Sequence, residues 1–136
     1  MGANAAPEVA VGAVCVRDGR LLLVQRARGS HAGRWAVPGG RVEAGESLAA
    51  AVTRELAEET GLRGRVTGLC GVAERCVDGH HWVILNHWVA VGPGEPVAAD
   101  DAAAVRWAGR DALASLDAVP LLVEFLTDHG VLARLR

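Results

Sequence analysis

The chain has no excess of positive charge. Lysine is absent, so all 14 cationic side chains are arginine, and against 16 carboxylates they leave a formal net charge of −2. A nucleic acid polymer is held mainly by a broad basic surface. The charge balance therefore argues against a nucleic acid partner. A small anionic ligand stays open, because it needs only a local group of cations.

Long apolar runs and paired cysteines are also absent. No apolar run approaches the roughly 20 residues of a membrane-spanning helix, and Met1–Glu8 lacks the basic start and apolar core of a leader peptide. The three cysteines, Cys15, Cys70 and Cys76, have no C-x-x-C spacing, which argues against a disulfide framework and a structural zinc site. These absences predict a cytoplasmic protein without a membrane partner.

The length bounds the number of domains. With 136 residues, 51% of them hydrophobic, the chain suits one core and is too short for two ordinary domains, so we expect a single domain over residues 1–136. Apolar runs over Val9–Val16 and Leu21–Gln25 flank Asp18-Gly19, a turn signal that predicts an opening hairpin.

Strand and helix signals then follow without strict alternation. Pro38–Gly40 predicts a turn, and the clearest helix is expected over Leu48–Thr60, with Ser47 as its N-cap and Gly61 at its end. We further expect two strands over Leu62–Val77 and His81–Val91 around the turn signal Asp78-Gly79. A strand over Val105–Trp107, a short helix over Arg110–Leu116 and a closing helix over Pro120–His129 follow.

Three carboxylates gather on the expected helix. Glu55, Glu58 and Glu59 are spaced i, i+3 and i+4, which places them on one helix face. Their mutual repulsion would be relieved by a hard divalent cation, for which carboxylate oxygens are suitable ligands. The spacing alone leaves a second interpretation open, a solvated acidic helix face.

A longer pattern surrounds these glutamates. Gly40, Glu46 and the segment Arg54–Leu62 match G-x5-E-x7-R-E-U-x-E-E-x-G-U, where U is apolar, at all nine constrained positions. The chain thereby resembles the Nudix hydrolase family, in particular its small MutT-like and ADP-ribose pyrophosphatase-like members. The preceding segment Trp35–Gly40 is also similar to the one that commonly leads into this motif.

The resemblance implies both a fold and a set of roles. The fold is a three-layer α/β/α sandwich with a mixed β-sheet, and the cofactor is Mg²⁺ or Mn²⁺. The implied metal ligands are Glu58, Glu59, Glu55 and the Gly39 carbonyl, with Glu55 also a candidate general base. Arg54 and Glu46 correspond to an ion pair that positions these glutamates. Gly40 and Gly61 are expected to serve backbone shape, at a loop turn and at the helix end.

Further candidates lie outside the motif. Asp101 precedes the strand at Arg106-Trp107 and is a candidate extra ligand or base, with a solvated loop acid as the alternative. Asp100 and Glu74 are weaker candidates for that role. Arginines beside the loop before the motif are suited to phosphate, with solvated surface positions as the alternative. They are Arg26, the first choice, then Arg34 and Arg28.

Histidine and tryptophan residues carry less chemistry. His80, His81 and His87 do not converge by strand spacing, and no nearby cysteine or carboxylate completes a zinc site. Trp82 and Trp88 are suited either to stacking on a nucleobase or, as is more common for large aromatics, to the core.

These patterns define three hypotheses for function. The first is a metal-dependent pyrophosphohydrolase that cleaves a nucleoside diphosphate linked to another moiety, and the looser whole-chain resemblance favours ADP-ribose as substrate. The second is a nucleoside triphosphate pyrophosphohydrolase that removes oxidised or noncanonical nucleotides. The third is a non-catalytic nucleotide-binding sensor, against which the complete set of glutamates argues. The expected partner is a small nucleotide, with a second copy of the chain as a candidate.

Overall fold

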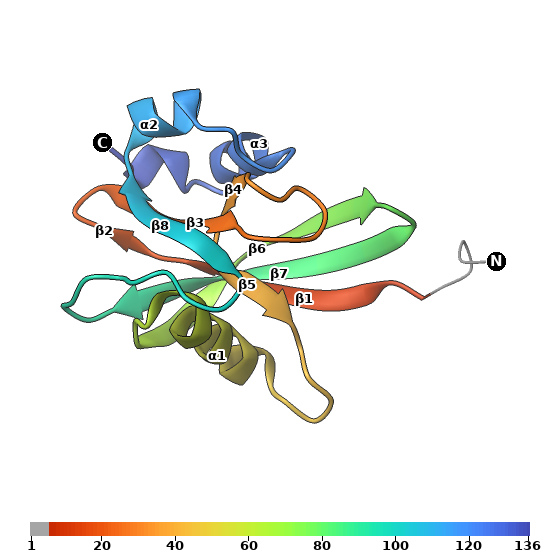
Figure 1. Ribbon diagram of the computed structural model, residues 1–136. Coiled ribbons are helices and arrows are strands. Elements are labelled where there is room, and N and C mark those ends of the chain that lie inside the picture. Colours follow the sequence, from red (N-terminus) through yellow and green to blue (C-terminus); the bar gives the residue numbers. More distant parts are fainter. Residues whose placement is uncertain (1–5) are drawn as a thin grey trace.

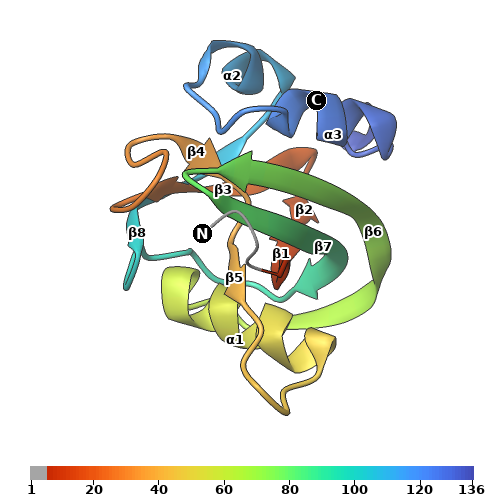
Figure 2. The same cartoon turned by 90° about the vertical axis from the view of Figure 1, so that its right-hand side faces the viewer.

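Three layers make up the molecule. The computed structural model describes residues 6–136. Residues 1–5, which belong to the expected single domain and to the segment Met1–Glu8 compared with a leader peptide, lie outside the described residues. One helix lies on one side of the strands and two short helices on the other (Figure 1). The perpendicular view keeps them on opposite sides (Figure 2). The expected α/β/α sandwich with a mixed sheet is confirmed.

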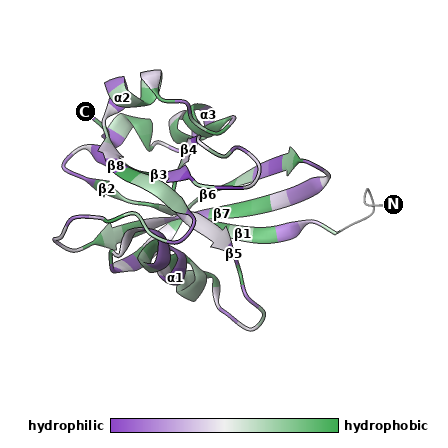
Figure 3. Ribbon diagram, in the orientation of Figure 1, coloured by the Kyte–Doolittle hydropathy of each residue, from purple (hydrophilic) through white to green (hydrophobic). Residues whose placement is uncertain are grey.

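The first sheet has four strands in the order β5-β1-β7-β6. They span Gly39–Arg41 (β5), Glu8–Val14 (β1), His80–Val91 (β7) and Gly64–Val77 (β6). β1 runs parallel to β7 and antiparallel to β5. The predicted hairpin of β6 and β7 is confirmed, and its turn residues Asp78 and Gly79 both have positive φ, 51° and 77°, as a type I′ turn requires. β7 is apolar in its middle and hydrophilic near this turn (Figure 3).

The second sheet is built around β3 (Arg20–Arg26), which pairs with β2 (Val16–Arg17), β4 (Trp35–Ala36) and β8 (Ala102–Ala108). The predicted opening hairpin is only partly correct, because just the end of the first apolar run pairs with β3. The rest forms β1 in the other sheet. β1 is buried on both faces from Ala10 to Val14, and such burial favours an inner strand with neighbours on each side.

The segment predicted as a turn at Pro38–Gly40 is instead the start of β5. Gly39 pairs with Gly12 of β1, and a Cβ at Gly39 would collide with the Val11 carbonyl oxygen. The glycines therefore permit a close approach of two strands, which a local turn signal does not reveal.

Helix α1 spans Leu48–Thr60, as predicted. The Ser47 hydroxyl accepts a hydrogen bond from the Ala50 N–H at 3.1 Å, and Gly61 closes the helix at a φ of 73°. On one side Val52 and Leu56 pack in a core cluster with Val11 of β1. This packing turns the glutamate-bearing side of α1 toward the edge of the first sheet.

The opposite layer contains α2 (Arg110–Ser115), α3 (Leu122–Asp128) and the short 3-10 helix η2 (Leu132–Arg134). α3 begins two residues later than predicted, because Leu121 adopts a left-handed φ of 68°. Its Leu126 packs with Leu21 and Leu23 of β3 in a second core cluster. Within residues 6–136, no helix is long and apolar enough to cross a membrane.

Candidate active site

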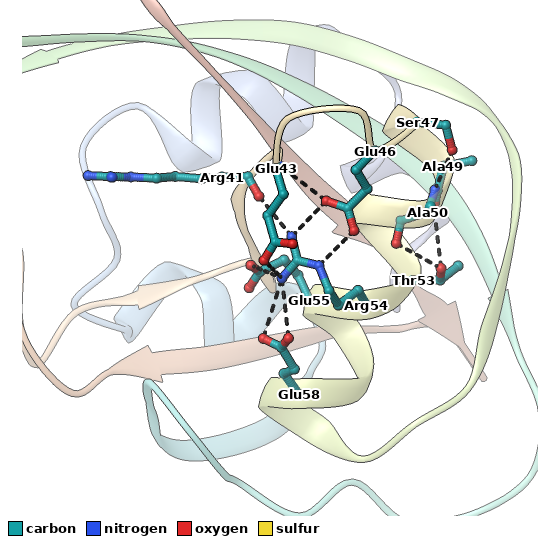
Figure 4. Close-up of polar contacts among 10 residues, drawn as sticks. All are labelled: Arg41, Glu43, Glu46, Ser47, Ala49, Ala50, Thr53, Arg54, Glu55 and Glu58. Carbon is teal, nitrogen blue, oxygen red and sulfur yellow. Dashed lines mark hydrogen bonds and ion pairs between the residues drawn. The ribbon is translucent and has the colours of Figure 1, made fainter.

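Arg54 joins the loop before α1 to the acidic face of the helix (Figure 4). Its Nε and Nη2 donate to the two carboxylate oxygens of Glu46 at 2.7 and 2.9 Å. Its Nη1 donates to Glu55 at 2.8 Å and to Glu58 at 3.2 Å. The hydrogen bonds from Arg54 lower the pKa of Glu46 to about 2, and those to Glu46 raise the pKa of Arg54. The ion pair that the resemblance implied is therefore formed, as a two-pronged contact.

Glu59 is a buried carboxylate at the end of the acidic face. Its side chain accepts the Gly39 N–H at 3.0 Å, and only 6% of the residue is exposed. Burial is the main cause that raises the pKa of Glu59 to about 8; the charges of Glu55 and Asp101 contribute to this rise, and the hydrogen bond from Gly39 opposes it. In the described part of the chain no arginine or histidine forms a salt bridge with Glu59. An ionised Glu59 is thus costly unless a cation accompanies it.

Glu55 lies beside Glu59 and is pressed against the backbone of β5. Burial is the main cause that raises the pKa of Glu55, and the charges of Glu58 and Asp100 add to it. A Cβ on Gly40 would lie 2.5 Å from the Glu55 carboxylate carbon. Gly40 also has no positive φ, so the expectation of a turn glycine is wrong there. Its missing side chain makes room for Glu55.

A cavity of about 590 Å³ begins at these glutamates. Glu55 and Glu59 lie in its wall together with Gly39, and the cavity continues over the face of the first sheet that lies away from α1. Several arginine side chains also line it, namely Arg26, Arg28, Arg41 and Arg75. Carboxylates and arginines thus share one space, which suits a ligand with phosphate groups and a cation between phosphate and carboxylate.

The acidic candidates outside the motif reach this cavity to different degrees. Asp101 lines it and pairs with Arg28 at 2.9 Å. Glu74 also lines it, with its carboxylate 2.9 Å from Nε2 of His81. Asp100 is close enough for its charge to raise the pKa of Glu55.

The two arginines predicted to bind substrate differ in position. Arg26 lines the cavity, and its Nε donates to the Ser30 carbonyl at 3.0 Å, which leaves the other guanidinium nitrogens available. Arg34 does not line the cavity and forms an ion pair with Asp117 at 3.7 Å.

The histidines do not converge. His80 stacks on Trp82, with ring centroids 5.7 Å apart, and His87 shares a hydrogen bond with the Leu85 carbonyl. Trp82 lines the cavity, whereas Trp88 packs under Arg134. Across the described residues, no three histidine, cysteine, aspartate or glutamate side chains are already arranged around a point where a metal would fit. Glu58 accounts for part of this, because it is drawn toward Arg54.

Sequence reasoning missed several cavity residues. Asn86 of β7, Arg75 of β6 and Phe125 of α3 all line the cavity. A signal for Asn86 was present, since strand alternation places it on the same face as Trp82 and Ile84. Nothing local linked these residues to the glutamates of α1.

The layers, the mixed sheet and the glutamate helix at the cavity wall define an α/β/α fold with an acidic site. The chain belongs to the Nudix hydrolase family, since the family model described as NUDIX domain matches residues 6–128.

Individual relatives agree with this membership. An ADP-ribose pyrophosphatase of Methanocaldococcus jannaschii is 41% identical over 99 residues, which cover 71% of this chain and 58% of that protein. A CTP pyrophosphohydrolase of Escherichia coli is 40% identical over 79 residues, covering 57% of this chain and 58% of that protein. The chain thus spans less than two thirds of the length of these two relatives. The crystal structure of a MutT NUDIX hydrolase from Burkholderia pseudomallei matches with a TM-score of 0.80 and 33% identity, over 90% of this chain and 98% of that one.

Proposed function

We propose that the protein hydrolyses a nucleoside diphosphate linked to a second group, with Mg²⁺ or Mn²⁺ as cofactor. One observation carries this proposal, namely that Glu55 and Glu59 lie at one wall of a cavity that arginines also line. A diphosphate requires cations around it, and buried carboxylates require a cation beside them. A divalent ion between substrate and glutamates meets both needs.

The residues present fit such an ion. Glu59 is buried with a single backbone donor, the Glu55 side chain beside it is only 14% exposed, and both offer the oxygen ligands that hard cations prefer. We assign the ligands to Glu58, Glu59, Glu55 and the Gly39 carbonyl. When bound, the cation neutralises charge that develops on the diphosphate oxygens and lowers the pKa of a coordinated water.

The chain supplies the remaining functions through its own side chains. Arg54 and Glu46 hold Glu55 and Glu58 in position, because one guanidinium contacts all three carboxylates. We assign to Glu55 the removal of the proton from the attacking water, with Asp101 as the second candidate for that role. We assign to Arg26 the binding of a substrate phosphate, whereas Arg34, the other candidate from the sequence, lies outside the cavity.

ADP-ribose is the leading substrate, and hydrolysis would release AMP and ribose phosphate. The similarity to an ADP-ribose pyrophosphatase over 71% of this chain supports this choice. The second candidate is a nucleoside triphosphate that loses pyrophosphate. It is favoured by the similarity to a CTP pyrophosphohydrolase and by Arg75, a cavity arginine without a carboxylate partner in the described chain.

A product assay tests these choices. The purified protein is incubated with Mg²⁺ or Mn²⁺ and ADP-ribose, other nucleotide sugars, dinucleotides or nucleoside triphosphates. We expect AMP and ribose phosphate from ADP-ribose as the preferred reaction, and a loss of at least about 100-fold in turnover for Glu58→Gln, because a metal ligand is removed. Glu124→Gln, an exposed change on α3, serves as the matched control and should keep full activity.

Each other outcome has a definite meaning. Release of pyrophosphate from a nucleoside triphosphate as the preferred reaction would mean that the substrate is a triphosphate and not ADP-ribose. Nucleotide binding without turnover in either metal would favour the non-catalytic sensor. Full activity of Glu58→Gln would contradict the assignment of the ligands.

A further inference from the structure

A row of small residues crosses the first sheet beneath the cavity. Strand register aligns Gly39 of β5 with Gly12 of β1, Gly12 with Asn86 of β7, and Asn86 with Gly71 of β6. Three of these four positions lack a side chain, so the Asn86 amide is the only side-chain hydrogen-bonding group of the row. A Cβ on Gly12 would collide with Oδ1 of Asn86. The amide therefore extends across the backbone of β1, in the direction of Gly39.

Asn86 is buried, and among the described residues its amide oxygen lacks a hydrogen-bond partner. Only 5% of the residue is exposed, and within residues 6–136 its Oδ1 is buried and has no hydrogen-bond partner. A buried acceptor left unpaired costs free energy, and such groups in native proteins call for an explanation. Oδ1 faces the backbone of β1, but Asn86 lines the cavity, so a rotation of its amide would let a ligand there supply the missing donor.

Most groups around the amide are apolar and suit a flat ring, and the His129 ring over the neighbouring Gly71 is the polar exception. Ile84 lies two residues before Asn86 on the same face of β7, and Val37 approaches Gly12. Leu122 and Phe125 of α3 also line the cavity. Sugars and phosphates need several polar partners, whereas a nucleobase presents apolar faces and a polar edge. One amide in an apolar slot therefore matches a nucleobase.

The position of Asn86 relative to the glutamates fits the same ligand. Gly39, whose N–H binds Glu59, is separated from Asn86 by two strand-to-strand steps, or roughly 10 Å. A ribose and its first phosphate bridge a separation of this kind between base and diphosphate.

We propose that Asn86 determines base specificity by binding a nucleobase that carries an exocyclic amino group. The amide oxygen accepts an N–H of the amino group, and the amide nitrogen donates to the adjacent ring nitrogen, a pairing that asparagine makes with adenine. Adenine and cytosine offer this edge, whereas hypoxanthine and uracil present a carbonyl oxygen at the corresponding position. The inference rests on the proposed function for the orientation of the nucleotide in the cavity.

Binding of nucleoside monophosphates without metal tests this inference apart from catalysis. Titration calorimetry compares AMP with IMP and CMP with UMP, for the wild-type chain, for Asn86→Leu and for Ile84→Val. In at least one pair the wild type is expected to bind the amino member about 10- to 100-fold more tightly. Asn86→Leu should remove that preference and leave the affinity for the weaker-binding nucleotide of the pair unchanged. Ile84→Val should change the affinities for both nucleotides of a pair by the same factor.

Thermal stability separates recognition from a structural role. Leucine branches at the same carbon as asparagine and has no unpaired acceptor, so Asn86→Leu is expected to keep or raise the Tm. If that variant does not fold, Asn86→Asp replaces it in the test. Aspartate keeps the acceptor and loses the donor, so it should lower the affinity for the nucleotide whose base carries the amino group. Equal binding within both wild-type pairs, or a preference that survives in the variants, would overturn the inference. Base preference without turnover on any nucleotide would refute only the proposed function.

Discussion

Gly40 shows how one absent side chain makes room for Glu55, the proposed catalytic group. The Glu55 carboxylate lies where a side chain at residue 40 would begin, because a Cβ built on Gly40 would be 2.5 Å from the carboxylate carbon of Glu55. In Gly40→Ala the flexible end of Glu55 must move, while the backbone of β5 can stay in place. Because displacement of a catalytic group by about 1 Å can cost 100-fold in rate, we expect a loss of roughly that size in kcat. The Tm should fall by only a few degrees.

Gly68→Ala is the matched control for this change. Gly68 is also a strand glycine without positive φ, and no atom lies within 4 Å of a Cβ built on it. Turnover assays and thermal denaturation of both variants should show full activity for Gly68→Ala. Normal turnover in Gly40→Ala would mean that the position of Glu55 is not critical for the reaction.

At the scale of elements, Arg54 and Glu46 connect the loop before α1 to the helix. Their two hydrogen bonds, at 2.7 and 2.9 Å, need the planar guanidinium, so lysine cannot reproduce them. We expect Arg54→Lys and Glu46→Gln each to lower turnover and to lower the free energy of unfolding, because each breaks this two-pronged contact. The double variant should cost little more than either single one, because both remove the same contact.

Urea denaturation of the four proteins gives the coupling energy between the two residues. A coupling close to zero would mean that the ion pair contributes nothing measurable, as happens for many exposed pairs. Turnover measured on the same samples shows whether the loss of the connection also displaces Glu55 and Glu58.

The elements differ in how well the sequence predicts them. α1 was predicted to the residue because its signals are local, a serine hydroxyl at one end and a left-handed glycine at the other. The β6–β7 hairpin was predicted because Asp78-Gly79 lies between its strands. β1 was assigned to the wrong partner, since its pairing with β7 joins residues about 70 positions apart and depends on burial of both faces.

At the scale of the whole molecule, the candidate site divides in the same way. The glutamates, Arg54 and Glu46 lie within one continuous motif, so a sequence pattern reveals them together. Asn86 and Arg75 meet that motif only because the sheet order brings β6 and β7 beside β1 and β5. Strand alternation can place Asn86 on one face with Trp82 and Ile84, but only the assembled sheet links it to the glutamates.

The buried glutamates also set how the stability of the metal-free protein depends on pH. Burial raises the pKa of Glu59 from 4.5 to about 8. The folded state therefore holds this proton more tightly than the unfolded state, and its stabilising effect is complete below pH 4.5 and disappears as pH rises to about 8. With a chelator present, we expect the Tm to fall by on the order of 10 °C between pH 5.5 and 8.5.

Glu59→Gln and Mg²⁺ isolate the contribution of this one carboxylate. Glutamine can still accept the Gly39 N–H but does not ionise, so the variant should lose most of the pH dependence and be more stable than the wild type at pH 8.5. Mg²⁺ should raise the Tm of the wild type at that pH and have little effect on the variant, because a bound ion stabilises only the state that binds it. Calorimetric unfolding at several pH values measures both effects. A wild-type Tm that does not change over this range, or a Glu59→Gln chain that is less stable at pH 8.5, would show that Glu59 is not the buried charge that the cation relieves.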